Sequence, residues 1–282
     1  MKRYLLLVIK IAPFMIAAII GLPLLKHIFK EPTAADLLSQ QYFMNSDSMY
    51  LDANLKMHVK TQFDMNDLLN SYTSAETTTA ILLDTEFNVK SDSLVQYLDG
   101  IVNTSFYGYE INVPTTNYTF ISDKNTVVCD YDFEADEWVT YKTVQKDSPY
   151  VNLTAFINQL NLNTIQNYEL SNTDNNTNVY YVSGTIDTNT LMAILCDTDI
   201  FEDTFSGTEN NVSKNSVSDV VILYDKKTRL PVTINIGSDN PDNITNVTLC
   251  LTINEIETKE YVTIPDEIIN IVTRNEDLNS EY

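Results

Sequence analysis

The chain has 282 residues and a formal net charge of −22, and 44% of its residues are hydrophobic. These values are typical of a globular protein with one large domain or two small ones. The charge argues against a nucleic-acid-binding protein, because neutralising phosphates needs a basic face. Residues 32–282 hold thirty-eight acidic and twelve basic residues. We therefore expect this part of the chain to be a soluble, strongly acidic body.

The N-terminal segment, MKRYLLLVIKIAPFMIAAIIGLPLLKHIFK, contains a long apolar run broken only by Lys10. Residues 4–25 can span a bilayer if the Lys10 ammonium reaches the head groups. No strong small-residue cleavage site follows the run. We predict an uncleaved signal anchor over 1–31, with a cytoplasmic N-terminus and the domain 32–282 on the extracellular side of the cell membrane. Basic residues also follow the run, which weakens the charge argument for this orientation, and cleavage of the segment stays open.

Strict alternation of apolar and polar residues predicts strands along most of the remaining chain. The longest alternating stretches are 49–59, 81–89, 107–113, 230–236 and 247–253. Shorter runs of the same kind include TVVCDYD, EWVTYKT, VYYVSGTI and DVVILYD. Together with less regular stretches, we expect about eleven strands.

Short helical patterns lie between these strands, with apolar residues spaced three and four apart. They are TAADLLSQQYF, DMNDLLNSY, NLTAFINQL and TNTLMAIL. Asp64 and Asn152 are the expected N-caps of the second and third, and the fourth begins after Asp187. We expect these helices to pack on one face of a sheet.

The stretch VILYDKKTRLPVTINI, residues 221–236, predicts a hairpin with its turn at 225–229. Pro231 has no N–H, so it must lie at a sheet edge or at the start of a strand, before pairing begins. The second position is favoured because the charged turn is immediately upstream. The polar insertion 197–218 is predicted to be a mobile loop.

Few residues in the chain point to catalysis. Histidine occurs only at His27 and His58, and His58 falls on the polar phase of its strand, where an exposed side chain is expected. Nucleophilic triads, zinc motifs and phosphate loops are absent from the sequence. We therefore predict a protein that is not an enzyme, with no cofactor and no metal.

Two acidic clusters, DYDFEADEW (130–138) and DTDIFED (197–203), offer several carboxylates on short segments. Neither has the spacing or the glycine of an EF-hand, so solvated turns are favoured over calcium sites. Three cysteines, Cys129, Cys196 and Cys250, form no CxxC pair and lie in or beside apolar runs. At least one must be unpaired, and one disulfide stays open.

The C-terminal half has an order of elements that resembles a known superfamily. A strand leads into the turn DKKTRLP, a second strand and a long strand ending NEIETKEYVTIPDEI. This order resembles the LolA-like lipoprotein-carrier superfamily, which includes mycobacterial lipid-binding lipoproteins and Gram-positive surface proteins. The opening helix TAADLLSQQYF with strand 48–61, and the segment VYYVSGTIDTNTLMAIL, are similar to its beginning and middle. The residue bias is typical of an AT-rich genome and favours a Gram-positive bacterium.

The resemblance implies an α+β fold with a strongly curved antiparallel sheet, an incomplete β-barrel, and short helices covering its concave face. It also implies a lipid or other hydrophobic ligand between the sheet and the helices. The candidate lining residues are Leu55, Met57, Ile81, Leu83, Tyr109 and Ile234 on strands, and Leu68, Leu69, Phe156 and Ile157 on helices. All ten fit plain core packing as well. An alternative is an extracytoplasmic sensor or regulatory module that contacts an envelope protein without a ligand.

Overall fold

A computed structural model describes residues 31–39, 50–64, 78–106, 108–120, 126–143, 150–171, 178–198, 200, 216–237, 245–257 and 260–278. The predicted anchor, apart from its last residue, lies outside these ranges. In the part of the chain that is described, no helix is long and apolar enough to cross a membrane.

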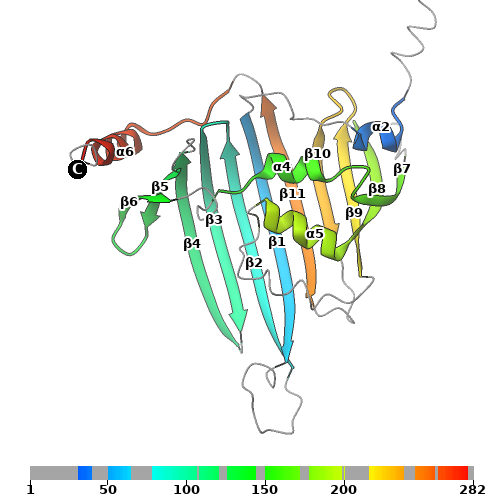
Figure 1. The fold of residues 1–282 in the computed structure, drawn as a ribbon, viewed down its shortest axis with the longest axis horizontal. Helices are drawn as coiled ribbons and strands as arrows, with labels where there is room; N and C mark the ends of the chain where they lie inside the picture. The colour runs from blue at the N-terminus through cyan, green and yellow to red at the C-terminus, as the bar shows by residue number, and fades with distance from the viewer. Residues whose placement is uncertain are drawn as a thin grey trace, which may run out of the picture.

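Eleven strands form one antiparallel sheet (Figure 1). They are β1 (Tyr50–Asp64), β2 (Thr78–Ser91), β3 (Val95–Phe106), β4 (Tyr109–Phe120), β5 (Thr126–Asp132), β6 (Glu137–Thr143), β7 (Ile165–Ser171), β8 (Val179–Asp187), β9 (Val217–Asp225), β10 (Pro231–Gly237) and β11 (Thr245–Glu257). Their order across the sheet is β6-β5-β4-β3-β2-β1-β11-β10-β9-β8-β7. The chain therefore starts in the middle, builds outward to β6, crosses to the far edge at β7 and returns until β11 pairs with β1.

The sheet is open, because β6 and β7 are its two edges and do not pair with each other. It twists but does not curl strongly (Figure 1). The expected antiparallel sheet of about eleven strands is confirmed, whereas the expected strong curvature and incomplete barrel are wrong. The physical reason is that apolar side chains are buried on both faces of this sheet. Curling tightly around one set would pull the other set apart.

The described helices are α2 (Ala34–Leu38), α4 (Leu153–Gln159), α5 (Thr188–Asp197) and α6 (Asp266–Leu278). Helices α4 and α5 cross one face of the sheet, in front of β1, β11 and β10 (Figure 1); we call this the helix face and the opposite one the outer face. The expected N-cap Asn152 is confirmed, since its Oδ1 accepts the N–H of Ala155 at 3.0 Å. Asp187 caps α5 in the same way through the N–H of Thr190 at 3.0 Å. The helix expected after Asp64 lies outside the described residues.

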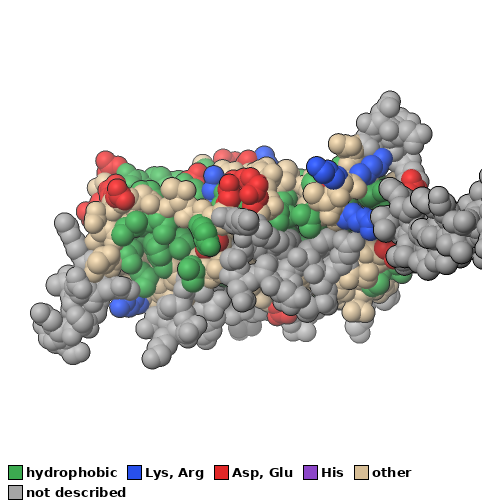
Figure 2. All heavy atoms as spheres, turned by 90° about the horizontal axis from the view of Figure 1, so that it is seen from above, with side chains coloured by type: hydrophobic (Ala, Val, Ile, Leu, Met, Phe, Trp, Pro, Cys, Tyr) green, Lys and Arg blue, Asp and Glu red, His purple; other side chains and the backbone are tan. Residues whose placement is uncertain are grey.

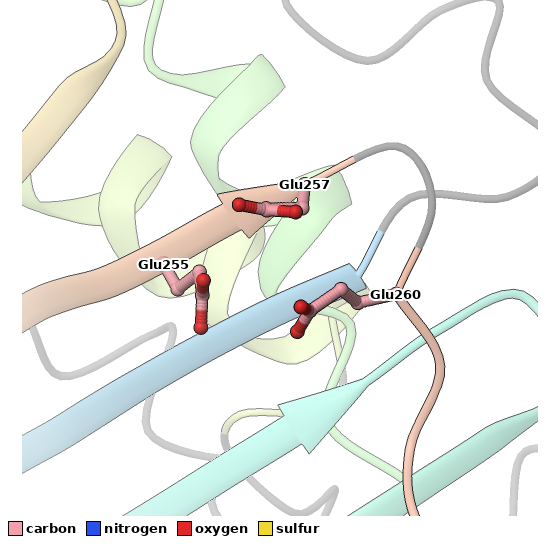
Figure 3. A group of neighbouring side chains, drawn as sticks. All are labelled: Glu255, Glu257 and Glu260. Carbon is pink, nitrogen blue, oxygen red and sulfur yellow. The ribbon is translucent and has the colours of Figure 1, made fainter.

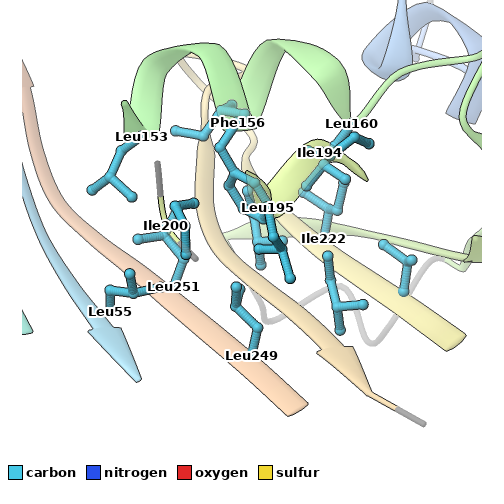
Figure 4. Packing of buried hydrophobic residues seen from close by; sticks show 14 of the residues in the cluster. Leu55, Leu153, Phe156, Leu160, Ile194, Leu195, Ile200, Ile222, Leu249 and Leu251 are labelled. Atoms are coloured by element: carbon cyan, nitrogen blue, oxygen red, sulfur yellow. The ribbon is translucent and has the colours of Figure 1, made fainter. Parts of the chain in front are cut away.

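The main core lies between the helices and the sheet. Side chains from both layers point toward one another there (Figure 4); those labelled are Leu55, Leu153, Phe156, Leu160, Ile194, Leu195, Ile200, Ile222, Leu249 and Leu251. Each fully buried leucine, isoleucine or phenylalanine contributes about 1.5–3 kcal/mol to folding. The apolar stripes of α4 and α5 are therefore confirmed as core contacts.

A second, smaller core lies on the outer face, where residues 260–278 pack over β3 to β6. It joins Tyr50, Val95, Tyr118 and Cys129 of the strands to residues of the C-terminal segment, Val262 and Ile268. The three cysteines form no disulfide with one another, and burial raises the pKa of the Cys129 thiol to about 11.

The C-terminal segment is fastened to the sheet by one carboxylate. Asp92, in the turn between β2 and β3, accepts the N–H groups of Leu94 and Val95 through Oδ1. Its Oδ2 accepts the N–H of Val262 at 2.8 Å. A single buried side chain therefore shapes the turn and holds the start of the segment that covers the outer face.

Helix α6 was not anticipated, because the sequence EIINIVT has the β-branched composition of a strand. The available signal was Pro265 followed by two acidic residues, Asp266 and Glu267, which is typical of a helix N-terminus. Ile268 and Val272, four residues apart, face the outer-face core. Tertiary packing therefore overrides the local strand preference.

The segment that crosses from β6 to α4 is held by the buried side chain of Gln96 on β3. Its Nε2 donates to the carbonyl oxygen of Val151 at 2.8 Å, and its Oε1 accepts the N–H of Val151 at 2.9 Å. Gln96 is completely buried, so it satisfies two backbone groups that water cannot reach. Val151, two residues before α4, is thereby held on the helix face.

We expect Gln96→Ala to lower the free energy of unfolding by about 1–3 kcal/mol, because it leaves the N–H of Val151 buried without a partner. The C=O of Val151 keeps one hydrogen bond, from the N–H of Leu153. Urea unfolding of the full chain measures this change. The control is Gln166→Ala at an exposed position on β7, which should change stability by less than about 0.5 kcal/mol. Equal effects of the two substitutions would contradict the role given to Gln96.

The hairpin between β9 and β10 is confirmed, with its turn between Asp225 and Leu230. Arg229 adopts a left-handed φ of 59°, and the Asp225 N–H donates to the carbonyl oxygen of Leu230 at 2.9 Å. Pro231 is the first residue of β10, and pairing with β11 starts only at Thr233. Pro231 already pairs with Tyr224 of β9. Its expected place at the start of a strand is therefore confirmed, but it precedes the pairing with β11 only.

The carboxylate of Asp225 accepts the N–H and hydroxyl of Thr228 and the N–H of Lys227, which lowers its pKa. A carboxyl with a lowered folded pKa stabilises the protein above its unfolded pKa of about 3.9, and this contribution disappears as the pH falls through the folded value. We therefore expect the stability difference between the native chain and Asp225→Ala to shrink in acid. Urea unfolding from neutral pH down to the acid limb measures it, and a difference independent of pH would contradict the assignment.

Candidate functional site

Seven apolar side chains lie on the helix face of β2, β3 and β4, beyond the helices. We call them the apolar strip: Ile81, Leu83, Val102, Phe106, Tyr109, Ile111 and Val113. The register places Leu83 beside the core residue Val59 on β1, so the strip continues the core face outward. At its outer side, Tyr109, Ile111 and Val113 are 77%, 60% and 50% exposed.

The strip is exposed because the alternation of the strands runs further than the helices that cover them. Helices α4 and α5 lie over the central strands and the β9 side (Figure 1). Seen from above, other hydrophobic side chains also lie at the surface, at the end of the molecule that holds β5, β6 and α6 (Figure 2). An exposed apolar patch on a chain this acidic is typical of a binding surface.

Thr85 lies at the inner border of the strip with an unpaired hydroxyl. It stands in the register row Met57, Thr85, Val102, Val113 across β1 to β4. Its side chain is 8% exposed, and its Oγ1 has no hydrogen-bond partner. An unpaired buried hydroxyl is destabilising unless another group or water satisfies it. The strip therefore has one unsatisfied polar atom at its inner border, and this atom is shielded from solvent.

A polar group also lies toward β5 and β6. Asp130 on β5 stands opposite Asn117 of β4 and Val139 of β6. Burial raises the pKa of Asp130, while a hydrogen bond from the Tyr141 hydroxyl lowers it in part. Val139 and Tyr141 are themselves partly exposed hydrophobic residues. The helix face of β5 and β6 is therefore mixed in character rather than a plain continuation of the strip.

The ten residues expected to line a ligand site are divided by the structure. Leu55, Met57, Phe156, Ile157 and Ile234 are buried in the helix-face core. Leu83 packs against the edge of that core, Ile81 is half-buried, and Tyr109 is exposed. Leu68 and Leu69 lie outside the described residues. The strip thus unites Ile81, Leu83 and Tyr109 but not the five core residues.

Sequence reasoning did not single out Phe106, Ile111, Val113 or Thr85. Ile111 and Val113 have the spacing of two from Tyr109 that places all three on one face, so the signal was present. What the sequence did not reveal was which part of that face the helices leave uncovered.

The middle of the outer face is a ladder of charged pairs. Lys56 Nζ lies 2.7 Å from Glu86 Oε1, and His58 Nδ1 lies 2.5 Å from Asp84 Oδ1. The expected exposure of His58 is confirmed. Pairs this exposed contribute at most about 1 kcal/mol each. The ladder is therefore a solvated surface that keeps charge off the helix face.

Three glutamates, Glu255, Glu257 and Glu260, meet where β11 ends (Figure 3), with carboxylate oxygens within 4.8 Å of one another. Desolvation raises the pKa of Glu255 first, and the charges of Glu260 and Glu257 raise it further. Carboxylate groups of this kind can bind a cation, but a surface cluster alone does not indicate one. The three carboxylates repel one another, and this repulsion can be measured through the pKa of Glu255.

The acidic turn between β5 and β6 uses its carboxylates internally. Asp132 accepts the N–H groups of Glu134 and Ala135 at 2.9 and 3.0 Å, and the Tyr131 hydroxyl donates to Asp136. Most of the second predicted acidic cluster, 197–203, lies outside the described residues.

We expect Glu260→Gln to lower the pKa of Glu255 toward its ordinary value of about 4.3, because it removes the charge that raises this pKa most. A carboxyl group whose pKa is raised in the folded state stabilises the protein as the pH falls through that folded pKa. Because the substitution lowers the pKa of Glu255, this gain in stability in acid should become smaller. Carboxyl-detected NMR titration measures the shift. Glu110→Gln, far away on β4, is the control that should leave Glu255 unchanged.

No protein-family model matches the sequence, and no curated protein matches it. The family is therefore not identified by comparison. The structure itself shows a single eleven-stranded antiparallel sheet with a few short helices. The surface of this sheet is the remaining indication of function.

Proposed function

We propose that the chain is a non-catalytic binding protein that holds a hydrophobic ligand, such as a lipid, against the apolar strip. The observation that carries the proposal is the exposure of Tyr109, Ile111 and Val113 on the same face of the sheet as the main core. Apolar area left open there can be removed from water only by something added to it.

The strip offers apolar area and has one unpaired polar atom at its border. Covering a large apolar side chain contributes about 1–2 kcal/mol, at about 25 cal/mol for each Å² buried. Several such side chains lie in adjacent rows. The unpaired Thr85 Oγ1 is buried, so a ligand oxygen would hydrogen-bond to it only after the side chains around it shift. An apolar surface with a small number of polar groups is the usual make-up of a small-molecule site.

The ligand is placed beside the helices rather than beneath them. Between α4, α5 and the central strands, side chains of both layers are buried against one another (Figure 4). A ligand there would have to displace Phe156 or Leu195, both of which are completely buried. The strip requires no such rearrangement.

The proposal includes membership of the LolA-like superfamily and anchoring by residues 1–31. A single antiparallel sheet with α4 and α5 on one face supports the membership, while the open, weakly curved sheet departs from it. An anchor in the membrane of a Gram-positive cell would hold the domain close to a source of lipid.

We expect a diazirine-bearing fatty acid to crosslink the full chain, reconstituted in nanodiscs, at residues 101–113. Ile111→Lys should reduce this crosslinking at least about tenfold, because a buried ammonium costs several kcal/mol. The matched control is Leu94→Lys, since Leu94 is 61% exposed and Ile111 60%, and Leu94 lies outside the strip. Peptide mass spectrometry locates the crosslinks.

Equal crosslinking of the two variants, or crosslinks spread over the whole surface, would contradict the proposal. Specific recovery of a protein partner by a chain that takes up no fatty acid would favour the sensor or regulatory function instead.

A further inference from the structure

The outer edge of β4 is unpaired over most of its length. β5 pairs with β4 only from Asn117 to Phe120, whereas β3 pairs with all of β4 from Tyr109 to Phe120. Within the described strands, residues 109–116 therefore have a partner on one side only. Beyond Asp130, β5 leads away from β4 into its own hairpin with β6 (Figure 1).

Pro114 fixes which backbone groups point to this free edge. Pro114 stands opposite Ile101 of β3, and because it has no N–H, this must be a pair that does not exchange hydrogen bonds with β3. Residues at a spacing of two share that orientation. The N–H and C=O groups of Glu110 and Asn112 therefore point outward, as does the C=O of Pro114. Between Glu110 and Pro114, the free edge offers two donors and three acceptors, at the repeat of an extended strand.

Hydrogen-bonding groups in this arrangement specify an extended polypeptide, because only another strand presents matching groups at the same repeat. The side chains beside the edge add a sequence preference. Ile111 and Val113 are exposed on the helix face, and Glu110 and Asn112 are exposed on the outer face. A strand added here would place its apolar residues beside Ile111 and Val113 and its polar residues beside Glu110 and Asn112.

Charge decides the kind of strand. In the described part of 109–143, Lys142 is the one basic residue, against six acidic residues: Glu110, Asp130, Asp132, Glu134, Asp136 and Glu137. The turn that holds most of them lies on the same side of β4 as the free edge (Figure 1). A second copy of the chain would bring a net charge of −22 and the same acidic residues, so its own edge is a poor partner.

We propose that the free edge of β4 binds an extended segment of another protein in which apolar residues alternate with lysine or arginine. The segment pairs with Glu110 and Asn112, its apolar residues lie beside Ile111 and Val113, and its basic residues face the acidic turn between β5 and β6. This binding goes beyond the proposed ligand function and does not depend on it.

The probe is a capped peptide of about nine residues that alternates lysine and valine, long enough to pair with the whole free edge. We expect it to bind the full chain in nanodiscs of neutral lipid, with affinity that falls as salt is added. Hydrogen–deuterium exchange should show new protection in residues 109–116. Asn112→Pro removes one outward N–H without touching the pairing with β3, as Pro114 already does two residues later, and should weaken binding at least about tenfold.

Asn112→Ala is the matched control and should bind the peptide as the native chain does, because it keeps the N–H. A peptide alternating glutamate and valine should not bind. The inference is overturned by any of three results: no binding of the lysine peptide, equal binding by Asn112→Pro and Asn112→Ala, or protection of 109–116 by self-association of the chain alone. Fatty-acid crosslinking should be unchanged in Asn112→Pro, whose altered side chain is on the outer face, so the two proposals fail separately.

Discussion

The whole architecture depends on the pairing of β1 with β2 on one side and with β11 on the other. A sheet that begins at its centre can be completed only if the chain crosses once from edge to edge. The crossing segment is anchored at Val151 by the two hydrogen bonds from Gln96. It then forms α4, whose apolar stripe, with that of α5, closes the main core over the central strands and the β9 side.

Because the two covering segments lie on opposite faces, neither face is fully covered. Helices α4 and α5 protect the centre and the β9 side of the helix face, and residues 260–278 protect part of the outer face over β3 to β6. Apolar residues of β2 to β4 on the helix face are thus left at the surface. The same two-sided burial keeps the sheet open, since curling would favour one core and disrupt the other.

The departure of β5 from β4 has a second consequence for the same region. It leaves a free backbone edge directly beside the exposed side chains of Ile111 and Val113. One end of β4 therefore presents two kinds of surface, an apolar one facing the helix side and a hydrogen-bonding one facing outward. Free edges are usually blunted by charge or proline. Pro114 removes one donor from this edge, whereas Glu110 and Asn112 keep their outward N–H groups.

By itself, the sequence determined much of the local structure: alternation placed nine of the eleven strands, though not β3 or β7. Asn152 and the residues after Asp187 placed two helices, and Pro231 placed a strand start. These features follow from backbone geometry and short-range side-chain chemistry, which are encoded within a few residues. Only the tertiary structure decided that EIINIVT forms a helix, that the sheet stays open and that Leu55 is core while Ile111 is surface. Those outcomes depend on contacts between segments far apart in the chain, such as Gln96 with Val151 and Asp92 with Val262. Periodicity identifies a face, but only packing determines which part of it is covered.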